Sequence, residues 1–116
     1  MKLAIVGTRN PGVSYKEWES LLLSKVETLD VSLIVSGGAM GIDAFAERWA
    51  ESNSINTKIF KPDYKSYGKA APLVRNKKIV EECDKVVAFP SEESRGTYHT
   101  LDYARKLRKR ITIIEL

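Results

Sequence analysis

The sequence predicts an α/β domain in which a five-stranded parallel sheet carries four helices on its two faces. Short, continuously apolar segments alternate strictly with amphipathic segments of helical period, the pattern of a sheet covered on both sides. A glycine-rich turn follows the second apolar segment, as in strand–turn–helix units. Right-handed crossovers then give a doubly wound sheet with strand order 3-2-1-4-5. The 116 residues suit a single domain, residues 1–116.

The individual elements follow from apolar periodicity and from helix start signals. Ser14 followed by Glu17 is typical of a capped helix start, and Pro72 suits the first turn of a later helix. Leu29 continues the apolar stripe of the first helix, which we expect to end there. Strands are expected at residues 2–7, 32–35, 57–60, 85–89 and 111–115, helices at residues 15–29, 42–53, 72–83 and 96–109, and the longest loop at residues 61–71.

The composition is that of an ordinary globular protein, with 43% hydrophobic and 29% charged residues. No apolar segment approaches the ~20 residues that a membrane span needs, so we expect a cytoplasmic protein with no membrane partner. The single cysteine, Cys83, excludes an intrachain disulfide and fits an apolar helix stripe. One cysteine and one histidine, His99, argue against a zinc site, and we expect neither a metal nor a cofactor.

The net charge of +4 is compatible with anionic partners. Much of the excess lies in residues 105–110, where the cations also suit a solvated helix end that complements the helix dipole. Charge alone therefore leaves a nucleic-acid partner open.

Ligands of doubly wound sheets bind outside the carboxyl ends of the strands, and the glycine-rich segments lie on that side. The turn after the second strand exposes backbone N–H groups at a positive helix end, an arrangement that binds anions. The alternative is a tight connection that needs glycine only for its backbone angles. Asp43 in the next helical turn suits either the helix dipole or a ribose hydroxyl. The turn comprises Ser36, Gly37, Gly38, Ala39, Met40 and Gly41.

Two further segments reach the same edge. Arg9 follows the first strand and can hold a phosphate with its planar guanidinium or pair with a nearby acid, while Thr8 offers a hydroxyl. The fourth helix opens with small residues and a glycine, which repeats the anion-site pattern. These segments contain Gly7, Thr8 and Arg9, and Ser94, Arg95, Gly96 and Thr97.

Arg75 and Asn76 share the inward-facing stripe of the third helix, near its start. A charged group and an amide that face inward need partners, which a ligand or an internal acid such as Asp63 or Asp84 would supply. We favour a ligand because inward polar groups at a crevice are usually functional. Tyr64 and Tyr67 of the long loop suit either base stacking or packing of the loop.

No nucleophile–base pair and no P-loop pattern can be found by spacing. Together, however, four segments resemble the SLOG superfamily, named for the SMF/DprA and LOG proteins, and most closely its small YspA/YpsA-like branch. The segments are Ala4 to Arg9; Ser36-Gly37-Gly38-Ala39 with Gly41, Asp43 and Ala46; Tyr67 to Ala71 leading to Arg75-Asn76; and Ser94-Arg95-Gly96-Thr97.

This resemblance implies a Rossmann-like fold, a nucleotide-derived ligand and a homo-oligomer. Our leading hypothesis is a sensor or binding protein for a nucleotide or nucleotide derivative. Arg9 and Arg75 would be its cations and Asp43 would bind a ribose hydroxyl. The implied binding residues are Gly7, Thr8, Arg9, Ser36, Gly37, Gly38, Ala39, Gly41, Asp43, Asp63, Lys69, Arg75, Asn76, Ser94, Gly96 and Thr97.

The superfamily offers two alternatives. LOG-like relatives cleave the N-glycosidic bond of nucleoside monophosphates with an arginine, matched by Arg75, and a glutamate whose position holds Thr100 here. A catalytic role for Arg75 would then need a substitute carboxylate such as Asp63 or Asp43. DprA-like relatives bind single-stranded DNA, which the positive net charge permits.

Overall fold

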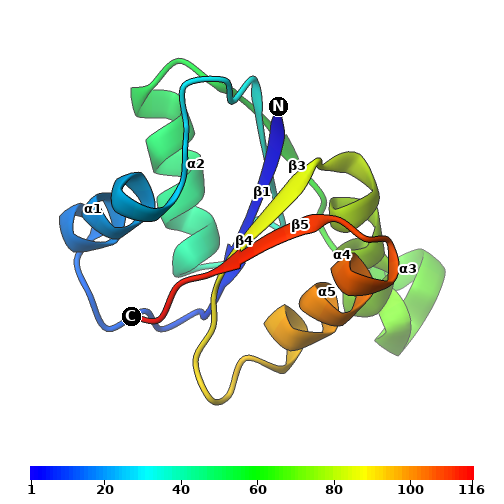
Figure 1. The fold of residues 1–116 in the computed structure, drawn as a ribbon. Helices are drawn as coiled ribbons and strands as arrows, with labels where there is room; N and C mark the ends of the chain where they lie inside the picture. Colours follow the sequence, from blue (N-terminus) through cyan, green and yellow to red (C-terminus); the bar gives the residue numbers. More distant parts are fainter.

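The computed structural model describes all 116 residues, and its five strands form one parallel sheet in the order β3-β2-β1-β4-β5 (Figure 1). Both the fold class and the strand order predicted from the sequence are therefore confirmed. Every neighbouring pair of strands is parallel. The strands are β1 (Lys2–Gly7), β2 (Leu33–Ser36), β3 (Asn56–Ile59), β4 (Lys85–Phe89) and β5 (Arg110–Ile113).

Four long helices cover the two faces of the sheet, with α1 and α2 on one side and α4 and α5 on the other (Figure 1). No helix is long and apolar enough to cross a membrane. The long helices are α1 (Tyr15–Lys25), α2 (Ile42–Ser52), α4 (Ala71–Glu82) and α5 (Arg95–Lys106); a short α3 (Tyr64–Tyr67) and a 3₁₀ turn η1 (Gly68–Ala70) lie between β3 and α4.

Successive residues of β1 point into two separate apolar cores, because side chains alternate across a strand. Ile5 belongs to the core under α1 and α2, where Trp18 packs with its ring centroid 5.6 Å from that of Phe89. Ala4 belongs to the core under α4 and α5, which also contains Cys83 at 1% exposure. The prediction that Cys83 is a core residue is confirmed.

Two helices end earlier than their apolar pattern predicts. Val26 is extended at φ −129° and ψ 132°, so α1 ends at Lys25, and Leu29 is 94% exposed. The last helix ends at Lys106 instead of residue 109, because Arg108 adopts φ +57° and reverses the chain. Since that left-handed residue is not a glycine, the sequence gives no stop signal there.

The segment expected to be the longest loop, residues 61–71, contains α3 and η1 instead. Asp63 explains the short helix, because its side chain accepts a hydrogen bond from the Ser66 N–H at 3.1 Å. An N-cap of this kind is a local signal. It makes Asp63 a structural residue of this segment.

Candidate functional site

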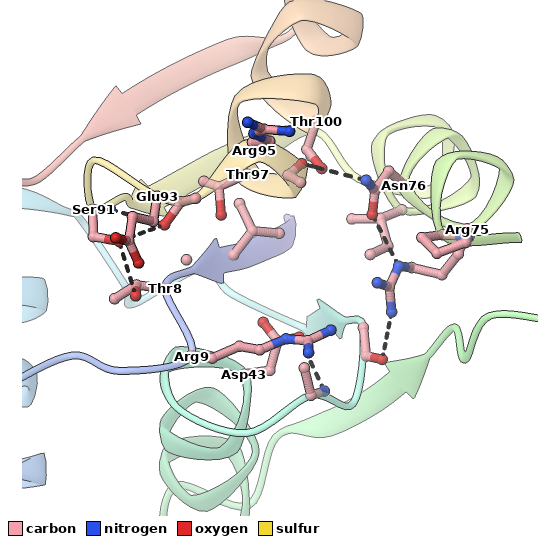
Figure 2. A pocket seen from close by; sticks show the side chains of 18 of the residues that line it. Thr8, Arg9, Asp43, Arg75, Asn76, Ser91, Glu93, Arg95, Thr97 and Thr100 are labelled. Carbon is pink, nitrogen blue, oxygen red and sulfur yellow. Dashed lines mark hydrogen bonds between the residues drawn. The ribbon is translucent and has the colours of Figure 1, made fainter. Parts of the chain in front are cut away.

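A cavity of about 1040 Å³ opens at the carboxyl ends of β1 and β4, between α2, α4 and α5 (Figure 2). This is the edge at which the predicted topology places a ligand. Most of the lining residues are polar, charged or glycine. The residues of the predicted binding set that line the cavity are Gly7, Thr8, Arg9, Gly37, Ala39, Asp43, Lys69, Arg75, Asn76, Ser94, Gly96 and Thr97.

Four residues of the predicted set lie outside this lining: Ser36, Gly38, Gly41 and Asp63. Ser36 is fully buried in β2, and its hydroxyl has no hydrogen-bond partner. A Cβ on Gly38 would stand 2.8 Å from Ile59 Cγ2, so this glycine packs against the end of β3. Asp63 caps α3, as described above. None of these four faces the cavity.

The start of α2 is closed by the loop that follows β1. Gly41, at φ +77°, lies so close that a Cβ there would meet the carbonyl oxygen of Thr8 and stand 2.5 Å from that of Arg9. The Ile42 N–H donates to the Thr8 carbonyl at 3.1 Å. The helix end that the sequence pattern offers as an anion site therefore packs against protein backbone.

Asp43 contributes a carboxylate to the cavity wall although only 7% of the residue is exposed. Its Oδ2 accepts a hydrogen bond from the Ala39 N–H at 3.1 Å. Burial raises the pKa of the Asp43 carboxyl, against the opposing effects of the Ala39 hydrogen bond and the Arg75 charge. An internal anion thus occupies a backbone donor of the glycine turn.

Arg75 finds its partners among backbone carbonyls. Its Nη1 donates to the carbonyl oxygens of Gly37 at 2.8 Å and Phe60 at 3.4 Å, and its Nε donates to Asn76 Oδ1 at 2.9 Å. Burial lowers the pKa of Arg75, and Asp43 opposes this effect. The prediction that Arg75 faces inward agrees with these contacts, and an ion pair with Asp63 is not formed.

Asn76 extends the same network to the other wall of the cavity. Its Nδ2 donates to the Gly96 carbonyl at 3.3 Å and lies 3.4 Å from His99 Nδ1. Arg75 and Asn76 therefore connect the glycine turn to the first turn of α5 across the cavity (Figure 2). His99 itself is half-buried.

The first turn of α5 offers free donors to the cavity. At α2 the corresponding N–H groups of Asp43 and Ala44 also have no acceptor within the protein. The backbone N–H groups of Gly96 and Thr97 have no acceptor within the protein. Thr97 is 7% exposed, lines the cavity, and its hydroxyl makes no hydrogen bond. The Ser94 hydroxyl accepts from the Ser91 N–H at 2.9 Å instead of capping the helix. Arg9 and Arg95 line the cavity from two sides (Figure 2).

Ser91, Glu92 and Glu93 also line the cavity, although no motif marks them in the sequence. Their loop follows β4, which pairs with β1 as far as Phe89 opposite Gly7. Residues just beyond the two paired strand ends must meet, and this is the signal that could have identified Ser91. Thr100 lines the cavity as well, but its hydroxyl donates to the Gly96 carbonyl at 3.0 Å.

Comparison of the sequence with models of known protein families identifies one match. The sequence model described as DNA recombination-mediator protein A matches residues 1–60, just over half of the chain. The chain belongs to this family. The match includes β1, the glycine turn and α2, and it supports the SLOG resemblance at the level of the superfamily. The assignment to the YspA/YpsA-like branch stays a prediction.

Individual proteins are similar to this chain in sequence or in fold. The Gene 61 protein of Mycobacterium phage D29 is 35% identical over 80 residues, which cover 64% of each protein. The structure of DNA processing protein A from Streptococcus pneumoniae matches 97% of this chain and 49% of its own with a TM-score of 0.73 at 22% identity. The Helicobacter pylori protein matches 97% of this chain and 64% of its own, with a TM-score of 0.73 at 23% identity.

These matches differ in what they cover. The chain spans about half to two thirds of the length of these relatives. At 22% and 23% identity the two structures establish the fold. The family match ends before α4 and α5, and the two structural matches, which cover 97% of the chain, establish the fold of this part.

Proposed function

We propose that the cavity binds a nucleotide unit and holds its phosphate at the first turn of α5. The observation that carries this proposal is the set of free donors there: two backbone N–H groups and the hydroxyl of Thr97, a residue of only 7% exposure that lines the cavity. Donors that line a cavity and have no acceptor within the protein are available to a ligand. A helix N-terminus also attracts negative charge.

The surroundings of this turn suit a phosphate and a sugar. Arg9 and Arg95 supply positive charge around the cavity, and guanidinium groups bind phosphates with two parallel hydrogen bonds. The volume of about 1040 Å³ is at the upper end of the ~300–1000 Å³ typical of small-molecule sites, which leaves room for a whole nucleotide. Asp43 on the opposite wall is an acceptor for a hydroxyl of the sugar.

A second candidate is that the nucleotide unit belongs to a single DNA strand. The H. pylori relative is described by its single-stranded DNA binding mode, and the present chain belongs to the same family. The net charge of +4 favours a polyanion. The same phosphate site at α5 would serve both ligands, and only the length of the bound chain differs.

Substitution of Thr97 by valine tests the phosphate site, because valine keeps the shape and removes the hydroxyl. Loss of one hydrogen bond to a charged group costs ~1.5–3 kcal/mol, so the dissociation constant should rise about tenfold or more. Titration calorimetry with nucleoside monophosphates measures this. Thr57→Val, on the exposed edge strand β3, is the matched control and should leave binding unchanged. Equal affinities of the Thr97→Val variant and the natural protein would overturn the proposal.

The salt dependence of the binding affinity distinguishes a mononucleotide ligand from a single DNA strand. Binding of a labelled single-stranded oligodeoxynucleotide through several phosphates should weaken linearly with log salt at a slope of about −0.7 per neutralised phosphate. A slope near that of one phosphate, together with tight binding of a mononucleotide, would favour the small ligand. A steep slope with weak mononucleotide binding would favour the strand.

Cleavage of the ligand and homo-oligomerisation stay predictions. For cleavage, Thr100 replaces the glutamate of the LOG-like enzymes, and Asp63 lies outside the cavity. Asp43 is then the remaining substitute carboxylate for a catalytic Arg75. Release of free base from a panel of nucleotides, lost in Arg75→Ala, would support an N-glycosidase.

A further inference from the structure

We propose that Asp43 closes the glycine turn to phosphate, so that the cavity accepts one phosphate, at α5, and rejects a second phosphate at the turn. This inference rests on the proposed phosphate site and adds the residue that determines ligand specificity. The sequence pattern offers two anion sites at this edge of the sheet, and in the structure a buried carboxylate lies at one of them, beside the glycine turn.

Two hydrogen-bond donors, one in the glycine turn and one at the start of α2, are already used within the protein. The Ala39 N–H donates to Asp43 Oδ2, and the Ile42 N–H at the start of α2 donates to the Thr8 carbonyl, each over 3.1 Å. A ligand phosphate that used either of these two donors would have to displace its present acceptor, and at Ala39 that acceptor is itself an anion. The donors of Gly96 and Thr97 on α5 need no such exchange.

Side chains fill the space beside Gly37. A single Cβ on Gly37 would stand 2.6 Å from Arg75 Nη1 and 3.1 Å from Asp43 Oδ2. Glycine at this position serves the close approach of Arg75 and Asp43, and this is a reason for its presence that requires no ligand phosphate.

Charge acts in the same direction. The Asp43 carboxylate is buried beside the glycine turn, where a second negative group would be repelled with little screening by water. The nearby Arg75 offsets part of this repulsion, but Gly37, Phe60 and Asn76 already hold its Nη1 and Nε donors. Neutral hydrogen-bond donors such as sugar hydroxyls are attracted to the same carboxylate.

The resulting ligand has a fixed direction in the cavity. Its phosphate lies at α5 and its uncharged, donor-bearing end lies toward Asp43. A ligand that carries a second phosphate in the direction of Asp43 meets an anion. The chemical class that fits is a nucleotide unit with a single phosphate group directed at α5.

Asp43→Asn tests the inference, because asparagine keeps the size and can still accept from the Ala39 N–H. The probes are inorganic phosphate and pyrophosphate, titrated by calorimetry, since they need no knowledge of the base. Removal of the charge should strengthen pyrophosphate binding relative to phosphate by at least tenfold. Glu47→Gln is the matched control, because Glu47 lies one turn further along α2, outside the cavity, and its removal changes net charge equally. In Glu47→Gln the ratio of pyrophosphate affinity to phosphate affinity should change less than twofold.

Thermal denaturation of each variant establishes that it is folded, and Asp43→Ser provides a second neutral replacement with the same expectation. The inference is overturned if both Asp43 variants leave the ratio of pyrophosphate affinity to phosphate affinity unchanged. If Thr97→Val still weakens phosphate binding in that case, the proposed site at α5 stands. Absence of phosphate binding by the natural protein overturns both.

Discussion

The hydroxyl of Ser91 donates a hydrogen bond to the hydroxyl of Thr8 at 3.1 Å, although 83 residues separate them in the sequence. The bond connects the loop after β4 to the loop after β1. Ser94 completes the cluster, with its hydroxyl oxygen 2.9 Å from that of Ser91. Loops from the two central strands are thus fixed to each other at the mouth of the cavity.

Ser91→Ala should therefore destabilise the protein by ~1 kcal/mol, the usual net contribution of one intramolecular hydrogen bond. Urea denaturation followed by circular dichroism measures the change. Ser24→Ala is the control, because Ser24 is exposed on α1 and donates only to the Leu21 carbonyl of its own helix. Equal effects of the two substitutions would show that the contact between the loops contributes nothing to stability.

Gly41→Ala should cost far more than Gly12→Ala, although both glycines have positive φ. Gly41 has φ +77° and no room for a Cβ, whereas Gly12 has φ +68° and nothing within 4 Å of a Cβ. Backbone strain alone costs ~1–3 kcal/mol at either position, so the difference between the variants isolates the packing of α2 against the Thr8–Arg9 backbone. Denaturation midpoints of the pair measure it, and similar midpoints would contradict the close packing.

Leu22→Ala and Leu29→Ala compare a buried with an exposed leucine near the end of α1. Leu22 has no exposed surface, so Leu22→Ala should lower the free energy of unfolding by ~2–5 kcal/mol, the range for leucine-to-alanine changes in cores. Leu29, at 94% exposure, should change the free energy of unfolding by less than ~0.5 kcal/mol. A large loss for Leu29→Ala would show that the helix continues to residue 29, as its apolar pattern predicts.

Asp43 should make the protein more stable as the pH falls. Its pKa is raised in the folded state, chiefly by burial, so the folded protein binds the proton more tightly than the unfolded chain. The free energy of unfolding therefore gains a contribution as the pH falls through the raised folded value toward the ordinary value of ~3.9. The difference between the natural protein and Asp43→Asn, measured by urea denaturation across this range, should shift in favour of the natural protein on acidification.

The contribution of Asp84 to the free energy of unfolding should change with pH in the opposite direction. Its carboxylate accepts a hydrogen bond from the Lys2 N–H at 2.8 Å, and this contact lowers the pKa of Asp84. The stabilisation is present above the ordinary value of ~3.9 and is lost as the pH falls through the lowered folded value. The advantage of the natural protein over Asp84→Asn should therefore shrink on acidification, and a growing advantage would contradict the assignment.

The sequence was sufficient for the centre of the sheet because β1, β2 and β4 are short apolar segments, and residues 85–89 form β4 as predicted. The edge strand β3 is mostly polar and exposed. The sequence was also sufficient for the inward direction of Arg75 and Asn76, which follows from helix periodicity. The partners of Arg75 could not be predicted, since the carbonyls of Gly37 and Phe60 lie 38 and 15 residues away and are brought together only by the folded sheet.

The hydrogen-bond partners of the glycine turn likewise could not be predicted from the sequence. Its residues have the pattern of an anion site, but whether their N–H groups are free depends on which loop packs against them. The structure places Thr8 and Asp43 there and leaves Gly96 and Thr97 without acceptors. Both helix starts looked alike in the sequence because occupancy of a donor is a property of tertiary contacts.

The chain of contacts from Gly37 through Arg75 and Asn76 to Gly96 has a consequence for the thermodynamics of recognition. Two adjacent side chains on one helix connect the walls, so these contacts hold the two walls together before any ligand binds. Little further ordering of side chains then accompanies binding, and its entropic penalty is small. The site should consequently bind ligands whose length matches the distance between the two walls and bind longer ligands more weakly. The heat-capacity change of binding should be similar for all ligands that fit.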